Sequence, residues 1–155
     1  MERWLSAHLP WPLFAGITGM NITTEHDAAR GAAAAAPAQN ASLSRLLTGT
    51  GSAAVKIYDG VMAASAADAP SGNLLATIDI TGASLDGSTI SFDVPISSLV
   101  TGADPSAGST ATWARILDAN GLQWGDVEIG AEITIDDPLL YNGAYVRIIS
   151  ASFTT

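Results

Sequence analysis

The 155-residue chain contains no cysteine and few charged residues. The absence of cysteine excludes disulfides, thiolate metal sites and cysteine nucleophiles. Charged residues make up 14% of the chain, against roughly 25% in an average soluble domain. No stretch reaches the ~18 uninterrupted apolar residues that a membrane-spanning helix needs. Because the chain is 48% hydrophobic and poor in charge, we expect it to bury surface against other proteins.

Positive charge is the scarcest kind and is unevenly placed. Six Lys and Arg residues stand against fifteen Asp and Glu residues, which gives a net charge of −9. Residues 1–50 are balanced, whereas residues 51–155 hold three cations against twelve carboxylates. Such a surface repels phosphate, so we expect neither a nucleic-acid partner nor an anionic membrane partner. The acidity favours solubility or docking onto a basic surface.

Residues 1–40 predict an extended, apolar N-terminal arm. Pro10 and Pro12 interrupt the apolar run and disfavour a helix. A cleaved signal peptide is not expected, because the start is not basic and the apolar run is broken. An arm of this kind gains stability by lying on another surface, where aromatic side chains serve as anchors; packing back onto its own domain is the alternative. The predicted partner-binding residues are Trp4, Leu9, Trp11, Leu13 and Phe14.

One short helix is expected after the arm. Five consecutive alanines precede Pro37 and predict a low-complexity linker, or a short helix that this proline stops. Asn40 then suits a helix N-cap, and Gly49 suits a C-terminal stop. Three leucines recur at the spacing of one helical face: Leu43, Leu46 and Leu47. We predict a two-turn helix over residues 41–48 whose leucine face packs against the following sheet.

From Ser52 onward, polar and apolar residues alternate, which predicts β-strands. The expected strands cover residues 54–59, 74–80, 89–94, 110–119, 122–129, 134–136 and 144–153. Pro95 indicates a sheet edge or the end of a strand. Asn120 and Gly121 lie between two β-rich runs and predict a hairpin turn of type I′, which needs a positive φ at both positions. Trp113 and Trp124, on facing strands of this hairpin, are expected in the core or at its rim.

These elements predict an all-β fold. The strands are joined by Gly, Ser, Asp and Pro clusters, and no long amphipathic helix separates them. This pattern favours an antiparallel β-sandwich of about seven strands, jelly-roll or Ig-like, over any βαβ fold. The expected organisation is an arm and Ala-rich linker over residues 1–40, followed by the short helix and the sandwich over residues 41–155.

Catalytic motifs are not found in the sequence. His8 and His26 lack the spacing of a zinc site, and no nucleophile elbow, phosphate loop or dinucleotide fingerprint is present. We therefore expect no enzymatic activity, no catalytic residues and no cofactor.

The carboxylates offer only weak candidates for chemistry. Asp136 with Asp137, and Asp126 with Glu128, lie too close in sequence to predict the opposed pair that acid–base catalysis needs. They are interpreted as solvated charges or a weak Ca²⁺ site. The run Asp-Ala-Asn-Gly at 118–121 is similar to the start of a calcium loop, but isoleucine stands where that loop requires glutamate. The hairpin turn explains this run better, and no metal site is predicted.

Three segments of the body, at Val55–Ile78, Gly108–Gly121 and Ile148–Thr154, carry motifs that resemble those of small structural proteins of tailed bacteriophages. In Val55–Ile78, a strand ending in Ile-Tyr-Asp-Gly is followed by a loop rich in Ala, Asp and Pro and then by Gly-Asn-Leu-Leu-Ala. Gly108–Gly121 contains Thr-Ala-Thr-Trp-Ala-Arg before the hairpin turn, and Ile148–Thr154 is similar to the closing strand of the group. The resemblance covers residues 42–155 and leaves residues 1–40 outside it.

This resemblance implies a virion protein, most specifically a capsid decoration or cement protein on the exterior of the phage head. The expected partners are the major capsid protein and further copies of the chain in a homo-oligomeric arrangement. Two alternatives stay open. A tail or neck component would form closed rings in isolation, and a carbohydrate- or receptor-binding module would expose Trp113, Trp124 or Tyr141 as a stacking platform.

Overall fold

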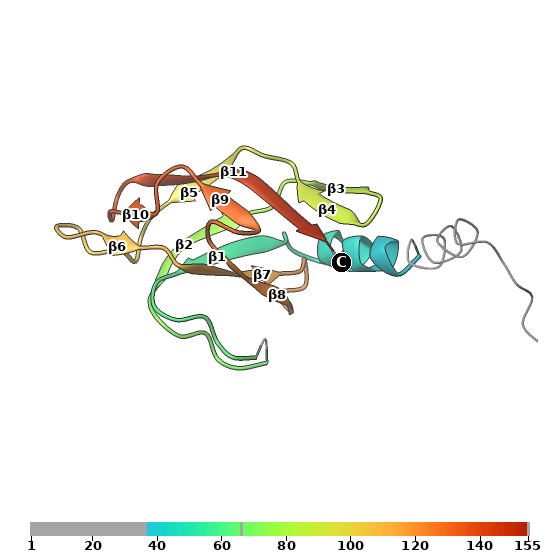
Figure 1. Cartoon of the computed structure of the whole chain (residues 1–155), viewed down its shortest axis with the longest axis horizontal. Helices are drawn as coiled ribbons and strands as arrows, with labels where there is room; N and C mark the ends of the chain where they lie inside the picture. The colour runs from blue at the N-terminus through green and yellow to red at the C-terminus, as the bar shows by residue number, and fades with distance from the viewer. Residues whose placement is uncertain (1–36, 66, 155) are drawn as a thin grey trace, which may run out of the picture.

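A four-stranded antiparallel sheet forms one layer of the molecule in the computed structural model, which describes residues 37–65 and 67–154 (Figure 1). Its strand order is β2-β1-β7-β8. The strands are β1 (Ala54–Tyr58), β2 (Leu74–Asp79), β7 (Trp113–Leu117) and β8 (Gln123–Glu128). Side chains alternate between the two faces of a strand, so Val55 and Ile57 enter the core while Lys56 points to the outer face.

The second sheet is built around the ten-residue strand β11 (Tyr145–Thr154). Its other strands are β3 (Ala83–Asp86), β4 (Thr89–Phe92), β5 (Ile96–Leu99) and β9 (Ile133–Ile135). Strand β5 pairs with the first half of β11 and β4 pairs with the last three residues, in nearly continuous register. We therefore place β4 and β5 end to end along one edge of β11, with β9 along the other edge. A two-stranded ribbon, β6 (Ser109–Thr110) with β10 (Leu139–Leu140), lies at one end of the molecule.

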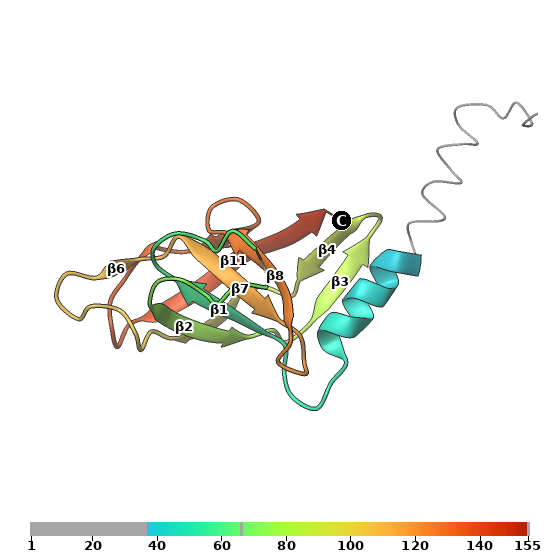
Figure 2. The same cartoon turned by 90° about the horizontal axis from the view of Figure 1, so that it is seen from below.

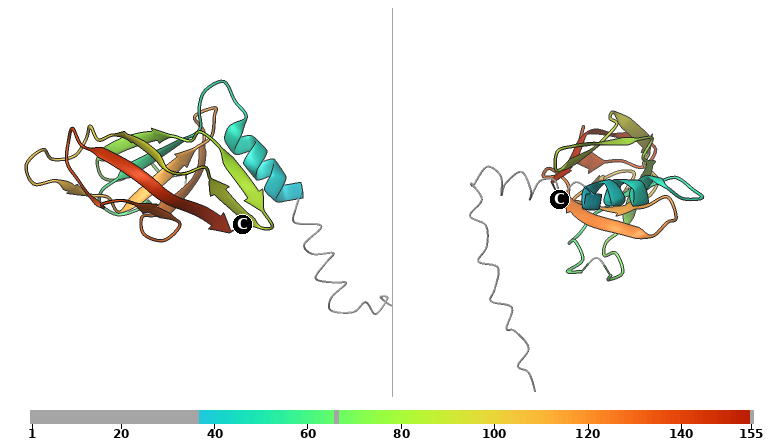
Figure 3. Two further views of the ribbon diagram at one scale, coloured as in Figure 1. Left: turned by 90° about the horizontal axis from the view of Figure 1, so that it is seen from above. Right: turned by 90° about the vertical axis from the view of Figure 1, so that its right-hand side faces the viewer.

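The core lies between the two sheets, which face each other as two layers (Figure 3). Its fully buried members come from both layers, including Ile57, Ile116, Ile90, Ile133 and Ile148. One side of the sandwich is closed where the N–H groups of Thr101 and Gly102 donate to the carbonyl of Leu75, at 3.0 and 3.2 Å. On the other side, the chain crosses between the sheets at Ile129–Ile133. The predicted antiparallel β-sandwich is confirmed.

All seven predicted strands are present, and the described residues contain four more. Strands β3, β5, β6 and β10 have two to four residues each, which is too short for a clear alternation. The segment of β3 is polar and flanked by glycines, so the sequence indicated a turn there. The structure instead pairs Ser84 with Ser91 and Asp86 with Thr89 in a β3–β4 hairpin.

The helix occupies residues 37–47 and so begins earlier than predicted. Asn40 lies inside the helix, so its predicted role as N-cap is wrong. Pro37 is the first residue of the described helix, so it does not stop a helix as predicted. The helix ends near the predicted stop, where the Thr48 N–H donates to the Ser44 carbonyl at 2.9 Å. The predicted leucine face is confirmed in part. Leu46 is fully buried and Leu43 is half-buried, whereas Leu47 is 38% exposed.

The helix lies against one end of the sandwich, beside β3 and the β7–β8 turn (Figure 2). The Ala119 N–H in that turn donates to the Leu46 carbonyl at 3.0 Å, and the Gly51 N–H donates to the Ala119 carbonyl at 2.8 Å. Gly49 makes this approach possible, because a Cβ there would lie 2.4 Å from the carbonyl carbon of Ala119. The helix is therefore joined to the hairpin by its backbone as well as by apolar packing.

Candidate functional site

The predicted arm residues lie outside the described part of the chain. Trp4, Leu9, Trp11, Leu13 and Phe14 precede residue 37, so their role in partner binding stays a prediction. The predicted hairpin residues and the aromatic residues of the body can be placed.

Asn120 and Gly121 lie in the turn of a β7–β8 hairpin, which confirms the hairpin. The predicted turn type is wrong. Gly121 has a φ of 75°, and no non-glycine residue in the described ranges has a positive φ. The Gly121 N–H donates to the Asp118 carbonyl at 2.8 Å, and the Asp118 N–H donates to the Leu122 carbonyl at 2.8 Å. This is a three-residue loop built on a type I turn, in which only the final glycine is left-handed.

Asp118 holds this turn to the helix and is only 1% exposed. Its Oδ1 accepts hydrogen bonds from the N–H groups of Asn120 and Leu122, both at 2.9 Å. Its Oδ2 lies 3.6 Å from Nε of Arg45 on the helix. The Asp-Ala-Asn-Gly run is therefore committed to turn and helix contacts, as the hairpin interpretation predicted.

A β-bulge brings Trp124 into the joint between helix and sandwich. In the β7–β8 ladder, Ile116 pairs with Gly125 and Leu117 pairs with Gln123, so Trp124 is the extra residue. A bulge re-aims a side chain relative to regular pairing. The Trp124 indole packs edge-on against Phe153 at 5.6 Å between ring centroids. Its Nε1–H donates to Oγ of Ser42 on the helix at 3.2 Å.

The outer face of the first sheet carries a buried aromatic and ionic cluster. Trp113 is fully buried and stacks on Tyr58, with ring centroids 4.6 Å apart. Arg115 lies beside the Trp113 ring and forms a two-pronged ion pair with Asp126, with both N···O distances at 2.8 Å. The third guanidinium nitrogen of Arg115, Nη1, donates to the carbonyl of Asp68 at 2.9 Å. The loop between β1 and β2 thus covers this face.

Burial and the ion pair with Asp126 shift the pKa values of two groups in this cluster. Desolvation raises the pKa of the Tyr58 phenol above its usual value, although the nearby Arg115 charge acts in the opposite direction. The hydrogen bonds to Asp126 raise the pKa of Arg115, more than burial lowers it. Every charge in the cluster is paired, so it is suited to holding the loop on the sheet and offers no free acid or base.

Exposed apolar side chains gather at the end of the sandwich opposite the helix. Leu99 and Tyr145 are cross-strand partners on the outer face of the second sheet and are 43% and 73% exposed. Leu139 and Tyr141 are each 39% exposed, and both reach the surface beside Gly108. We call these four residues the tyrosine end. Of these four residues, only Tyr141 was considered as exposed from the sequence. The alternation along β11 puts Tyr145 on the same face as Arg147 and could have shown that it faces outward.

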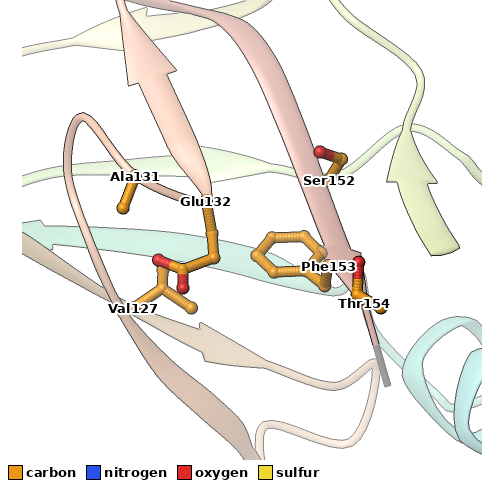
Figure 4. Close-up of a pocket in the computed structure, with 6 residues that line it drawn as sticks. All are labelled: Val127, Ala131, Glu132, Ser152, Phe153 and Thr154. Atoms are coloured by element: carbon orange, nitrogen blue, oxygen red, sulfur yellow. The ribbon is translucent and has the colours of Figure 1, made fainter.

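A groove lies at the other end, between the open side of β8 and the end of β11 (Figure 4). It has a volume of about 520 Å³ and is lined by Val127, Ala131, Glu132, Ser152, Phe153 and Thr154. In Figure 4 the Phe153 ring points toward Glu132, whose carboxylate lies next to Val127. The groove could not be predicted, because its walls come from three segments that only the fold brings together.

Three of the four carboxylates that were considered for chemistry have structural partners, and the fourth, Glu128, is exposed. Asp126 is paired with Arg115. Oδ1 of Asp136 accepts the N–H groups of Asp137 and Arg147, both at 3.1 Å. Within residues 37–65 and 67–154, no group of three or more His, Cys, Asp or Glu side chains is arranged to hold a metal ion.

Comparison with models of protein families, with curated proteins and with solved structures found no match for this chain. Among the described residues, no helix has the length and apolar character needed to cross a membrane. The class that the fold defines is therefore an all-β sandwich with an attached helix.

Proposed function

We propose that this chain is a structural protein of the bacteriophage virion, a capsid decoration or cement protein that stabilises the head by binding across capsid subunits. The motifs at Val55–Ile78 and Gly108–Gly121 suggest this class through their resemblance to small phage structural proteins. In the structure these motifs form the β1–β2 loop with its flanking strands and the strand that leads into the β7–β8 hairpin. Their residues serve the fold, which agrees with a protein that works by contact.

The observation that carries the proposal is the exposed Leu99–Tyr145 pair of the tyrosine end. The core between the sheets is filled without these two side chains, so folding does not require them. Aromatic side chains that stay exposed beside other apolar residues are typical anchors of protein interfaces. An interface of standard size buries about 1,600 Å². The tyrosine end and the apolar arm together would supply apolar anchors for two such contacts.

In this proposal the partners are the major capsid protein and other copies of the chain. The arm reaches a neighbouring subunit, the tyrosine end rests on the capsid, and the acidic faces point outward or meet a basic surface. Many symmetric copies add their binding energies through avidity, so each single contact can be weak.

The sugar-binding alternative loses its predicted platform. Trp113 is buried beneath Tyr58 and Arg115, and Trp124 is committed to Phe153 and Ser42. Of the three predicted platform residues, Tyr141 alone is exposed. A single ring is a poor stacking surface, and no further observation favours this function.

The test uses phage particles assembled from the genome that encodes this chain, with its gene deleted. We expect the full chain to bind these particles to saturation. A chain lacking residues 1–35 should stay folded and lose attachment, and Tyr145→Ser should lower occupancy. The matched control is Tyr58→Phe, whose ring is buried. Full occupancy by the truncated chain would exclude the arm as the attachment segment. A failure of the full chain to bind would overturn the proposal, as would a stable ring of six or more copies in light scattering.

A further inference from the structure

The groove between β8 and β11 lies where the fold leaves strands without neighbours. Among the described strands, β8 pairs only with β7. The β9 ladder stops at Ala151, and beyond it the Ser152 N–H donates to the Glu132 carbonyl at 3.0 Å. Past this bond, β11 continues to Thr154 with β4 on one side. Exposed strand edges next to apolar side chains invite association, so folded proteins usually cover them.

Open space also lies on the core-facing side of β8, two residues from the groove residue Val127. Gly125 shares the core-facing side of β8 with Val127, because their partners Ile116 and Ala114 both face inward. A Cβ at Gly125 would find no atom within 4 Å. A large apolar side chain entering beside Phe153 and Val127 therefore has room next to Gly125.

The chain itself holds a segment of matching chemistry. Residues 4–14 read Trp-Leu-Ser-Ala-His-Leu-Pro-Trp-Pro-Leu-Phe and contain no Asp, Glu, Lys or Arg. A segment without carboxylates meets no repulsion from Glu132 or from a body rich in acidic residues. Pro10 and Pro12 restrict the backbone around Trp11 to extended conformations, which lowers the entropy lost on binding.

The distance to be spanned is short compared with the available chain. The first described turn of the helix lies at the same end of the molecule as the end of β11 (Figures 2 and 3). Residues 15–36 connect the apolar segment to this helix, and 22 residues reach about 70 Å when extended. A tethered segment has an effective concentration on the order of millimolar. Binding within one molecule therefore prevails over binding between molecules at ordinary protein concentrations.

We infer that residues 4–14 occupy the groove of their own chain in the free protein, with Trp4 or Trp11 inserted beside Phe153 and Val127. The occupied groove covers the β8 edge and keeps the apolar arm out of water until a partner takes it. This inference goes beyond the proposed function, on which it rests only for the arm's later release to a neighbouring subunit.

The test uses the full chain and its lack of cysteine. A nitroxide is attached to Cys in Thr154→Cys, and the indole N–H signals of the ¹⁵N-labelled protein are recorded. Trp124 packs against Phe153 and serves as an internal reference that must broaden. We expect the Trp4 or Trp11 signal, assigned with Trp4→Phe and Trp11→Phe, to lose most of its intensity as well. A label at Ala107→Cys, in the loop before β6, should leave both arm signals intact.

Two further measurements make the result decisive. Adding Ala131→Glu, which places a charge in the groove, should restore the arm signals and leave Trp124 broadened; Ala107→Glu is the matched control and should restore nothing. Intact arm signals with the Thr154 label would overturn the inference. It would also be overturned if spin-labelled, unenriched protein broadened the arm signals of ¹⁵N-labelled protein without a label, because the occupant would then be a second copy. Particle binding is measured separately, so the two proposals can fail independently.

Discussion

At the scale of single residues, two of the few buried polar side chains hold separate backbone segments together. Asp118 ties the hairpin turn to the helix, and Arg115 ties the β1–β2 loop to the first sheet. None of the buried side-chain nitrogen or oxygen atoms in the described ranges lacks a hydrogen-bond partner. Removing one partner leaves the other buried and unpaired, so single substitutions in these pairs should be costly.

The Arg115–Asp126 pair gives the sharpest stability prediction. Both side chains are less than a tenth exposed, so Asp126→Ala would leave a buried guanidinium without its counter-charge. We expect a loss of about 3–5 kcal/mol in the free energy of unfolding, measured by urea denaturation. Glu128→Ala, an exposed carboxylate on the same strand, is the control and should change stability by less than about 0.5 kcal/mol. Equal effects of the two substitutions would contradict the role assigned to the pair.

Tyr58 predicts an alkaline limit to stability. Burial raises the pKa of its phenol above the ordinary value of 10.0, so the folded state favours the neutral form. Stability from this group is fully present below the unfolded pKa and is lost as the pH rises toward the folded pKa. Between pH 8 and pH ~11, the urea midpoint should fall further for the natural chain than for Tyr58→Phe. Tyr145→Phe, whose ring is 73% exposed, should behave like the natural chain.

The sequence predicted some of these residues and not others. Trp113 and Trp124 were placed in the core or its rim by their positions on a hairpin. Trp124 does pack against the core, whereas Trp113 is fully buried on the outer face of the first sheet. The partners of Arg115 could not be predicted. Asp126 follows from hairpin register, but the bulge at Trp124 shifts that register, and the Asp68 carbonyl comes from a loop with no pattern of its own.

At the scale of elements, the helix behaves as part of the sandwich. It shares backbone hydrogen bonds with the β7–β8 turn and a side-chain bond with Trp124. Its leucine spacing was readable in the sequence, whereas its start was not, because both Asn40 and Pro37 are residues that commonly mark helix boundaries. The short strands β3, β5, β6 and β10 were not predicted, because they are too short to show a pattern. Tertiary pairing, and not local preference, decides their conformation.

Leu46 tests the docking of the helix. This side chain is fully buried, so Leu46→Ala should lower the free energy of unfolding by about 2–5 kcal/mol. It should also shift the emission of Trp124, whose indole bonds to the same helix. Leu47→Ala is the matched control, since Leu47 is 38% exposed, and should cost less than about 1 kcal/mol. Similar losses for both leucines would show that the helix does not dock through this face.

At the scale of the whole molecule, the surface is acidic and its cations are few. The described residues hold four Lys and Arg, and two of these, Arg45 and Arg115, already face carboxylates. Large exposed apolar side chains therefore offer the strongest means of attachment. Whether apolar or ionic contacts carry the proposed attachment can be measured by varying the salt concentration.

Salt separates these two modes of attachment. If the apolar arm and the tyrosine end carry the binding energy, particle occupancy should persist at 1 M NaCl, where the Debye length is about 3 Å. Attachment through the acidic faces would weaken steeply over the same range, as charge-steered contacts do. Occupancy measured by sedimentation at low and high salt makes the comparison. A loss at high salt would show that charge, rather than burial, joins the protein to its partner.

Hydrogen bonds between Asp59 and Asn73 join the two ends of the loop between β1 and β2. The Asn73 N–H and side-chain amide donate to the two carboxylate oxygens of Asp59 at 2.5 and 3.0 Å, which clamps the two stems together. Beyond the clamp, Val61 is 80% exposed and Ala64 and Ser65 lie at the surface. A foreign peptide inserted between Ala64 and Ser65 would be carried outward without disturbing the sheet. The same clamp that orders this loop thus makes it a place where the chain can display a foreign peptide.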